Sequence, residues 1–312
     1  MNHPTPFALF VFLCSLILSS CIEFEHQKLS YVHNEAEDEL RITLTYNGIF
    51  GNLHQEEDFQ NSPGDIATED RLNQKQIKQL ESVLEQKRAF FFSNWIAEYS
   101  ASSSGQMIEQ IIQKNDHGRF GKPEMEMIEL LRKSVDVQNI GFYQDKMGKL
   151  CGGQTIKISN ISRVLASANE VIRRQIVAHI PQMQKEQEKD IPGSWSSETI
   201  DLIEKKLTSE FPFIQLEGNL LTFSTILSEA EQKKLTEDSL KDLPSFVRIE
   251  FSKEGANLLI GGKADKVVNL SKKCFDGYYP NALSYLQIKH RNLLLPQKEI
   301  ENTLSNFLST AK

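Results

Sequence analysis

The first clear pattern in the chain is an unbroken apolar run near its start, followed by a polar body. The run covers residues 7–18, and the chain beyond residue 21 is never as apolar again. Twelve residues in a helix rise about 18 Å, which is short of the roughly 30 Å hydrocarbon core of a bilayer. This length is typical of the hydrophobic part of a secretion signal rather than of a membrane-spanning helix.

Past this run, apolar and polar residues alternate in several short segments, which predicts antiparallel hairpins. In the clearest segment, Leu40, Ile42 and Leu44 alternate with Arg and Thr. Gly218-Asn219, between two other segments, is typical of a two-residue turn of type II′. The predicted hairpins pair residues 28–33 with 40–46, two strands within 137–158, residues 213–217 with 220–224, and residues 245–252 with 257–260.

Other segments repeat apolar residues every three or four positions, which predicts amphipathic helices. The clearest stripe begins at Ile161, Val164 and Ala168, and Ser228 and Glu231 have the spacing of a capping box at the start of another helix. The predicted helices cover residues 69–99, 107–114, 123–134, 160–182, 197–209, 228–241, 281–290 and 297–310. Helices and hairpins mix without the strand–helix alternation of a parallel sheet, so the predicted fold class is α+β.

A charged run at residues 184–190, followed by Pro192-Gly193-Ser194, is the best candidate for a domain boundary. It separates an N-terminal α+β domain, residues 21–190, from a C-terminal α+β domain, residues 191–312. A single domain is the alternative, because a length of 312 residues is compatible with either arrangement.

The charge of the chain narrows its range of partners. The formal net charge is −7, and residues 1–20 contain no Lys, Arg, Asp or Glu, so the body keeps this charge without them. Nucleic acids and anionic lipid headgroups attract basic surfaces. We therefore expect no nucleic-acid partner and no adhesion to membranes by charge.

The segment Leu18-Ser19-Ser20-Cys21 directly follows the apolar run. A branched apolar residue, two small residues and a cysteine resemble the lipobox of bacterial lipoproteins. The resemblance implies that residues 1–20 are a signal peptide removed before Cys21. It also implies a diacylglyceryl group on the Cys21 sulfur, and often a further acyl chain such as palmitate on the new amino group. There are two alternatives: a signal cut near residue 21 without lipid, and a buried core helix at residues 7–18 with an ordinary thiol at Cys21.

The same resemblance implies a place for the protein. Ile22 follows Cys21, and the usual sorting of bacterial lipoproteins then favours the outer membrane, with the body outside the cytoplasm. Each buried CH₂ of an acyl chain contributes about 0.8 kcal/mol to membrane binding. The expected partners are thus the membrane, through the acyl chains on Cys21, and an envelope protein.

Two further cysteines of the body, Cys151 and Cys274, remain to be explained. An exported protein meets an oxidising compartment, where a single disulfide between them can form. Their spacing does not show that they meet, so a disulfide and two buried thiols both stay open.

Common catalytic signatures are missing from the sequence. The motifs that are missing are Gly-x-Ser-x-Gly, His-Glu-x-x-His, Cys-x-x-Cys, Gly-x-Gly-x-x-Gly and the phosphate-binding loop. One remaining hypothesis places the Cys151 thiol on an exposed turn, with His117, His179 or His290 as its base. The alternative for His179 is a hydrogen-bonded core histidine, since it lies beside an apolar helix stripe.

Three other segments have weaker functional interpretations. The side chains at Asp58, Gln60, Ser62 and Glu69 fit four positions of a calcium loop, but Pro63 stands where that loop needs glycine. The aromatic turn 274–280 is a candidate pocket wall, and the aromatic cluster 90–95 a candidate platform. A structural turn and a helix core are the alternatives for these two. We therefore expect no metal and no cofactor.

These observations favour a noncatalytic, membrane-anchored protein of the bacterial cell envelope that acts by binding or assembly. The main alternative is an exported enzyme, a hydrolase or a thiol enzyme, whose site is built from distant residues. A third hypothesis is a carrier with an enclosed apolar cavity.

Overall fold

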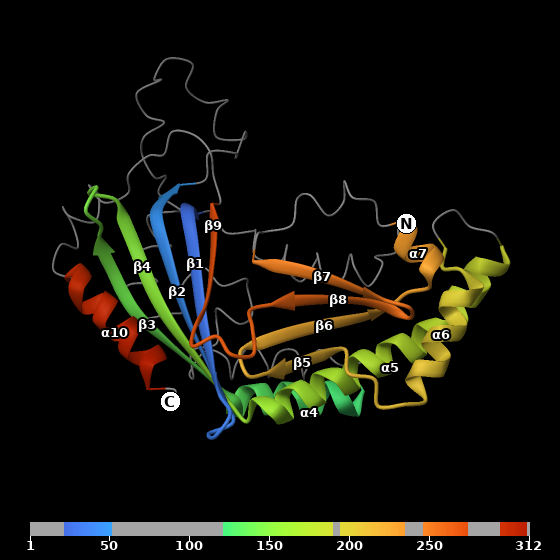
Figure 1. Ribbon diagram of the computed structural model, residues 1–312. Coiled ribbons are helices and arrows are strands. Elements are labelled where there is room, and N and C mark those ends of the chain that lie inside the picture. Colours follow the sequence, from blue (N-terminus) through green and yellow to red (C-terminus); the bar gives the residue numbers. More distant parts are fainter. Residues whose placement is uncertain (1–21, 52–120, 190–193, 235–245, 274–293, 311–312) are drawn as a thin grey trace, which may run out of the picture.

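The computed structural model describes residues 22–51, 121–189, 194–234, 246–273 and 294–310. Within them the chain forms two antiparallel sheets and several helices, which confirms the predicted α+β class. The strands of the two sheets run across one another in Figure 1, with two long helices beneath them. The predicted helices at 69–99, 107–114 and 281–290 lie outside the described residues.

The larger sheet has five strands in the order β3-β4-β2-β1-β9. Its strands are β1 (Ile22–Asn34), β2 (Glu39–Gly51), β3 (Val135–Gln144), β4 (Leu150–Ser159) and β9 (Val268–Lys273). The hairpins predicted at 28–46 and 137–158 are both confirmed. On one face of this sheet Leu44, Tyr46 and Leu150 are completely buried, as alternation along the strands requires.

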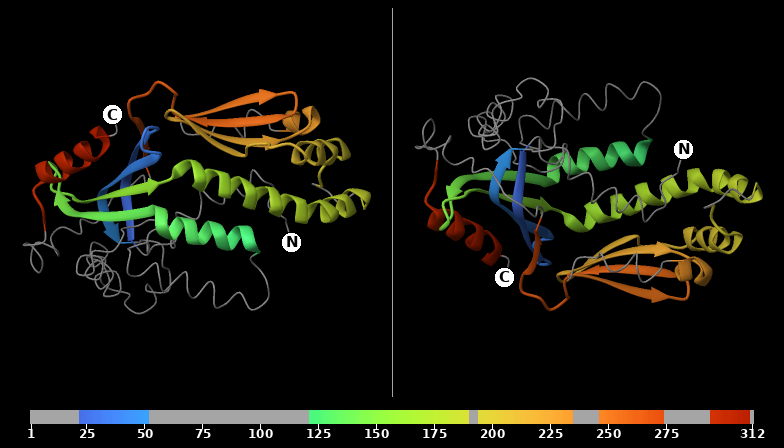
Figure 2. Two further views of the ribbon diagram at one scale, coloured as in Figure 1. Left: turned by 90° about the horizontal axis from the view of Figure 1, so that it is seen from below. Right: turned by 90° about the horizontal axis from the view of Figure 1, so that it is seen from above.

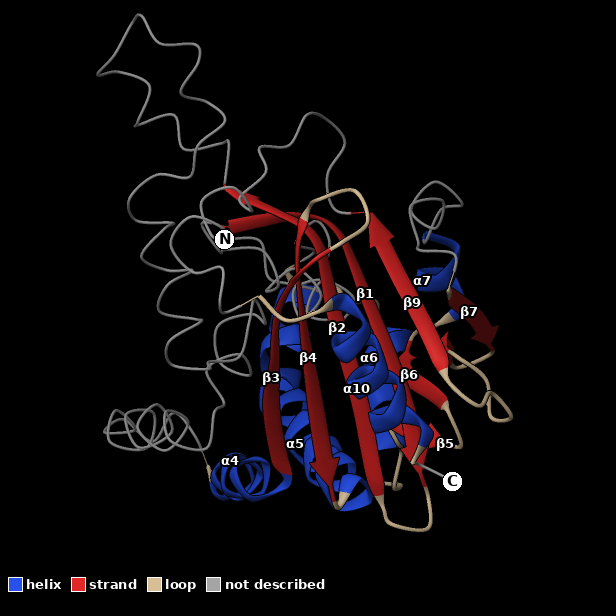
Figure 3. Cartoon of the chain, turned by 90° about the vertical axis from the view of Figure 1, so that its left-hand side faces the viewer, coloured by secondary structure: helices blue, strands red, loops and turns tan. Residues whose placement is uncertain are grey.

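Helix α10 (Gln297–Ser309) lies on the other face of the larger sheet, in front of the strands in Figure 3. Its side chains Ile300 and Leu304 pack against Tyr143 and Cys151. These inward positions agree with the apolar repeat predicted for residues 297–310.

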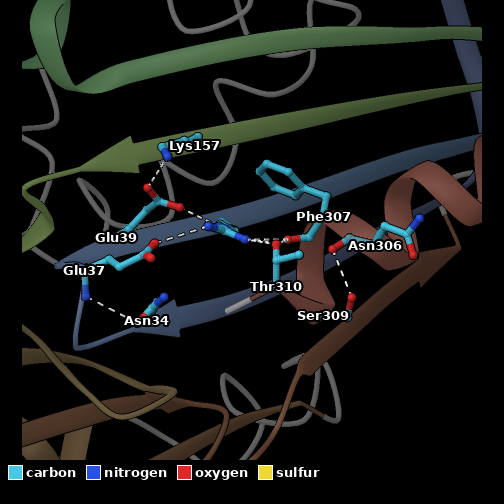
Figure 4. A network of polar contacts seen from close by, with 9 residues as sticks. Asn34, Glu37, Glu39, Lys157, Asn306, Phe307, Ser309 and Thr310 are labelled. Carbon is cyan, nitrogen blue, oxygen red and sulfur yellow. Dashed lines mark hydrogen bonds and ion pairs between the residues drawn. The ribbon is translucent and has the colours of Figure 1, made fainter. Parts of the chain in front are cut away.

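A polar network fixes the last turn of α10 to the sheet (Figure 4). The Arg41 guanidinium donates to the Phe307 carbonyl at 3.2 Å, to the Thr310 hydroxyl, and to Glu39 at 2.5 Å. Burial disfavours the charge of Glu39, but hydrogen bonds from Lys157 and Arg41 outweigh it and hold the pKa of Glu39 below 4.5. The Arg41 guanidinium thus pairs with a carbonyl at the C-terminal end of α10.

The smaller sheet has four strands in the order β5-β6-β8-β7. They are β5 (Ile214–Glu217), β6 (Leu220–Ile226), β7 (Val247–Ser252) and β8 (Gly255–Ile260). Both predicted hairpins are confirmed. Gly218 has φ of +55° while Asn219 keeps a negative φ, in agreement with the predicted type II′ turn.

Helices α4 (Lys122–Ser134) and α5 (Ile161–Glu188) run side by side away from the larger sheet (Figure 2). The buried Glu124 joins them. It accepts from the backbone N–H of Gly121 at 3.0 Å, from Gln175 at 2.6 Å, and from Arg174. One carboxylate therefore both caps α4 and attaches it to α5.

Helix α5 is longer than the sequence predicts. It continues from the predicted end at residue 182 to Glu188, so most of the charged run at 184–190 is helical and not a linker. The domain boundary itself stays a prediction. Residues from both sides of it build the larger sheet, because β9 pairs with β1 and α10 packs on the same sheet.

The capping box predicted at Ser228 is only half right. Helices α6 (Ser197–Leu207) and α7 (Glu229–Lys234) begin next to each other, and the Ser228 hydroxyl accepts from the Glu231 N–H as predicted. In a capping box the glutamate side chain also accepts from the N–H of the capping residue. Here that second bond is made between the two helices. Glu231 accepts from the Ser196 N–H at 3.3 Å, and the Ser228 N–H donates to Thr199 at 3.1 Å.

Strand β5 is an edge strand, and one side chain of α5 closes its outer edge. The Asn169 amide oxygen accepts from the N–H groups of Phe213 and Ile214 at 2.7 and 2.8 Å. Its nitrogen donates to the Ile214 carbonyl at 2.8 Å and to the Leu165 carbonyl at 2.9 Å. Asn169 thus takes the place of a neighbouring strand.

We expect Asn169→Ala to lower the free energy of unfolding by about 2 kcal/mol, because it leaves partly buried backbone groups of β5 without partners. Urea unfolding would measure this loss. The matched control is Asn302→Ala on the exposed side of α10, for which the change should stay within about 0.5 kcal/mol. Equal effects of the two substitutions would contradict the role of Asn169.

Candidate functional site

The two sheets meet where the β5–β6 turn rests against strand β1. The Asn219 side chain accepts from the His33 N–H at 2.6 Å and donates to the Asp265 carbonyl at 2.6 Å. The Tyr31 hydroxyl lies 3.0 Å from the carbonyl oxygens of both Asn219 and Ile260. Burial, with the nearby charge of Asp265, raises the pKa of Tyr31 to about 12, so this hydroxyl keeps its proton at neutral pH.

We call this contact between the β5–β6 turn and strand β1 the joint. It requires a glycine. Gly218 has φ of +55°, and a Cβ atom there would lie 2.3 Å from the Lys263 carbonyl oxygen. Both the left-handed backbone and the close approach exclude a larger residue. The turn and the joint therefore depend on the same position.

A hollow of about 210 Å³ opens beside this joint, between the β1–β2 turn and the start of α5. Its lining combines three titratable side chains with three aliphatic ones and a hydroxyl, namely His33, Glu35, Asp38, Ile161, Ser162, Leu165 and Leu216. The sequence predicted only that the 34–38 segment connects the two strands of a hairpin. This hollow is the candidate site that the structure adds.

Asp38 holds the start of α5. The residue at the N-cap position, Asn160, has φ of +54° and makes no side-chain cap. Asp38 replaces that cap: its carboxylate accepts from the Ser162 N–H at 2.9 Å and the Ser162 hydroxyl at 2.7 Å, and its carbonyl accepts from the Ile161 N–H at 3.0 Å. The N-terminus of a helix favours a negative charge, and the Asp38 carboxylate already occupies that position at α5.

His33 and Glu35 are also engaged in the joint. Glu35 accepts from the Gly218 N–H at 2.8 Å, and Nδ1 of His33 lies 2.9 Å from the Gly218 carbonyl oxygen. A carbonyl can only accept, so Nδ1 carries the hydrogen of this bond.

The size of the hollow limits what it can do. Ligand pockets usually enclose about 300–1,000 Å³, and this hollow is smaller and partly polar. Its three titratable side chains already support the backbone. This arrangement suits a structural joint that admits small polar molecules rather than a carrier for an apolar ligand.

The structure corrects the hypothesis of an exposed Cys151 nucleophile. Cys151 lies within strand β4 and is completely buried. Its sulfur donates to the Lys149 carbonyl and accepts from the Asn47 side chain. Burial raises the pKa of the Cys151 thiol to about 11, so almost none of it is thiolate at neutral pH.

The core interpretation of His179 is also wrong. His179 is exposed on α5, although its Nδ1 does bond to the Gln175 carbonyl at 2.6 Å. The bond lies within one turn of the same helix. His179 therefore neither fills the core nor approaches Cys151, which lies in the larger sheet.

The pairing of Cys151 with Cys274 stays a prediction, because Cys274 lies outside the described residues. The alternative of two buried thiols stays open as well.

The remaining sequence-based candidates lie outside the described residues. They are Cys21 with its signal peptide, His117, His290, the calcium-loop residues Asp58, Gln60, Ser62 and Glu69, the aromatic cluster 90–95 and the turn 274–280. Among the residues that are described, no group of three or more His, Cys, Asp and Glu side chains could hold a metal ion. No described helix is long and apolar enough to cross a membrane.

Comparisons of the chain with protein-family models, with curated proteins and with solved structures found no match. The functional argument therefore depends on the residues of this chain alone.

We expect Asp38→Ala to lower the free energy of unfolding by about 2 kcal/mol, since it removes the cap of α5 and places alanine at a positive φ. Asp38→Asn keeps a side-chain acceptor and tolerates that backbone, so it should cost less than about 1 kcal/mol. Thermal or urea unfolding would compare the two variants. An equal loss in both would contradict the capping role.

We expect Cys151 to resist iodoacetamide at pH 8 in the folded protein, because it is buried and its pKa is about 11. In urea without reductant it should alkylate fully, as peptide mapping by mass spectrometry would show. Rapid labelling of the folded protein would restore the nucleophile hypothesis. Resistance in urea, relieved by reductant, would instead establish a disulfide.

Proposed function

We propose that this chain is a lipid-anchored protein of the bacterial cell envelope, and that its body acts by binding or assembly rather than by catalysis. The observation that carries the proposal is the position of Leu18-Ser19-Ser20-Cys21, after an apolar run and directly before strand β1, which begins at Ile22. An acyl group on Cys21 would leave almost no tether. The larger sheet would then be held at the bilayer surface.

One end of the larger sheet would face that bilayer. Strand β1 begins at the upper end of the sheet in Figure 1, and the β3–β4 turn lies at the same end. Lys149 next to this turn is 2.5 Å from Glu25 of β1. At the tip of the turn Lys146 is exposed and Met147 is 74% exposed, so an apolar and a cationic side chain would meet the lipid interface together.

The sorting of the protein follows from the residue after the anchor. Ile22 favours transfer to the outer membrane by the rule that the lipobox resemblance implies. The enzyme alternative loses Cys151 as its nucleophile because that residue is buried, and the described residues hold no His, Cys, Asp and Glu group that could bind a metal. Binding or assembly at the membrane surface is therefore the better supported role.

Incorporation of an alkyne-labelled fatty acid in bacterial cells tests the anchor directly. We expect label in the wild-type chain and in Cys14→Ser, the control within the apolar run, and no label in Cys21→Ser. The N-terminal peptide of the native protein should begin at residue 21 and carry the mass of its acyl groups. Label that persists in Cys21→Ser, or an unmodified thiol at Cys21 in the wild type, would overturn the proposal.

A further inference from the structure

Three of the four outer strands of the two sheets have their outer edges protected. Residues 294–295 cover β3, with the Leu295 N–H donating to the Phe142 carbonyl at 2.8 Å. Asn169 closes β5, as described above. Strand β9 ends in two lysines, a residue type that discourages strand pairing. Strand β7 contains no lysine, and no described residue covers its outer edge.

The outward-facing groups of β7 follow from its pairing with β8. A two-residue turn joins these strands, so the closing pair Ser252↔Gly255 is hydrogen-bonded and such pairs then alternate. The N–H and C=O groups of Val247, Ile249 and Phe251 therefore point away from β8. In the part of the chain that the structure describes, nothing bonds to them.

The side chains of β7 divide cleanly between the two faces of its sheet. Val247, Ile249 and Phe251 lie on one face, and Phe251 is 46% exposed although it is large and apolar. Arg248 and Glu250 lie on the other face and are both exposed. An unprotected edge with alternating apolar residues is a strand that pairs readily with another.

We propose that β7 pairs with β7 of a second copy of this chain, antiparallel and about a two-fold axis at Ile249. In this register Ile249 faces its own equivalent and Val247 faces Phe251, so all outward-facing backbone groups bond to one another. Arg248 then lies opposite Glu250 of the other copy, and the symmetry makes this pair twice. The charge pattern of the strand is complementary to itself.

The charges of the strand disfavour the neighbouring registers. Because outward-facing residues must pair with outward-facing residues, the register can change only in steps of two. A step in one direction places Arg248 opposite Arg248, and a step in the other places Glu250 opposite Glu250. Both put like charges in the closest cross-strand position, which is destabilising. The charges therefore select the pairing about Ile249.

The pairing would join two four-stranded sheets into one of eight strands. Arg248 already donates one N–H to the Gly261 carbonyl at 2.9 Å, and its other N–H groups remain for the Glu250 side chain of the second copy. The apolar faces of the two sheets would become continuous. A strand from an unrelated protein could also fit the backbone, but the self-complementary charges favour a second copy.

A charge-swap series on the full chain in detergent tests this interface. Analytical ultracentrifugation should show a dimer for the wild type. Arg248→Glu and Glu250→Arg should each weaken the dimer about ten-fold or more, because each creates two like-charge pairs. The double variant Arg248→Glu/Glu250→Arg restores opposite charges and should dimerise within a few-fold of the wild type.

Cysteine crosslinking tests the register itself. Ile249→Cys should form a disulfide-linked dimer under mild oxidation, because facing residues in such a pair lie about 5.5 Å apart. Ser252→Cys, on the same strand, should not crosslink, since the two copies of that residue lie about 20 Å apart. A monomer at all concentrations, a dimer insensitive to the charge swaps, or crosslinking of the Ser252→Cys control would overturn the proposal.

Discussion

The relative position of the two sheets depends on the contact between the β5–β6 turn and strand β1. The sheets share no strand, and the residues that join them lie 185–188 positions apart in the chain. Tyr31 and His33 bind the Gly218-Asn219 backbone and side chain through bonds of 2.6–3.0 Å. Hydrogen bonds in such a partly buried place are strong, and a broken one leaves a polar group without water. The hollow lies beside this contact, between the β1–β2 turn and the start of α5.

Local patterns in the sequence were enough to predict most elements of the fold. The hairpins follow from alternation and turn chemistry, and the helices from their apolar repeat, because both signals lie within a few residues. The exchanged caps of α6 and α7, the closure of β5 by Asn169 and the capping of α5 by Asp38 were not predictable. They join residues 29, 45 and 124 positions apart, and no short segment records such a contact.

The same difference between local signals and long-range contacts holds for the candidate functional residues. Cys151-Gly152-Gly153 reads as an exposed turn, yet these residues lie in strand β4, where a Cβ on Gly153 would lie 3.3 Å from Ile300 of α10. The glycine allows the helix to approach the sheet rather than forming a loop. His33, Glu35 and Asp38 were missed as a group, because only the fold brings the β1–β2 turn to α5. The lipobox resemblance, in contrast, is a contiguous motif and was found from sequence alone.

The cap that Asp38 supplies to α5 has a consequence for how the chain folds. A helix nucleus is costly to form, and the first turn of α5 has no stabilising side chain of its own. It becomes stable only after the β1–β2 hairpin has closed and presented Asp38. The hairpin at the start of the body should therefore form early, and the long helix should become ordered from its C-terminal side or together with the hairpin. A contact between segments so far apart in the chain slows folding. It also makes the folding of α5 depend on a hairpin that is synthesised well before the helix.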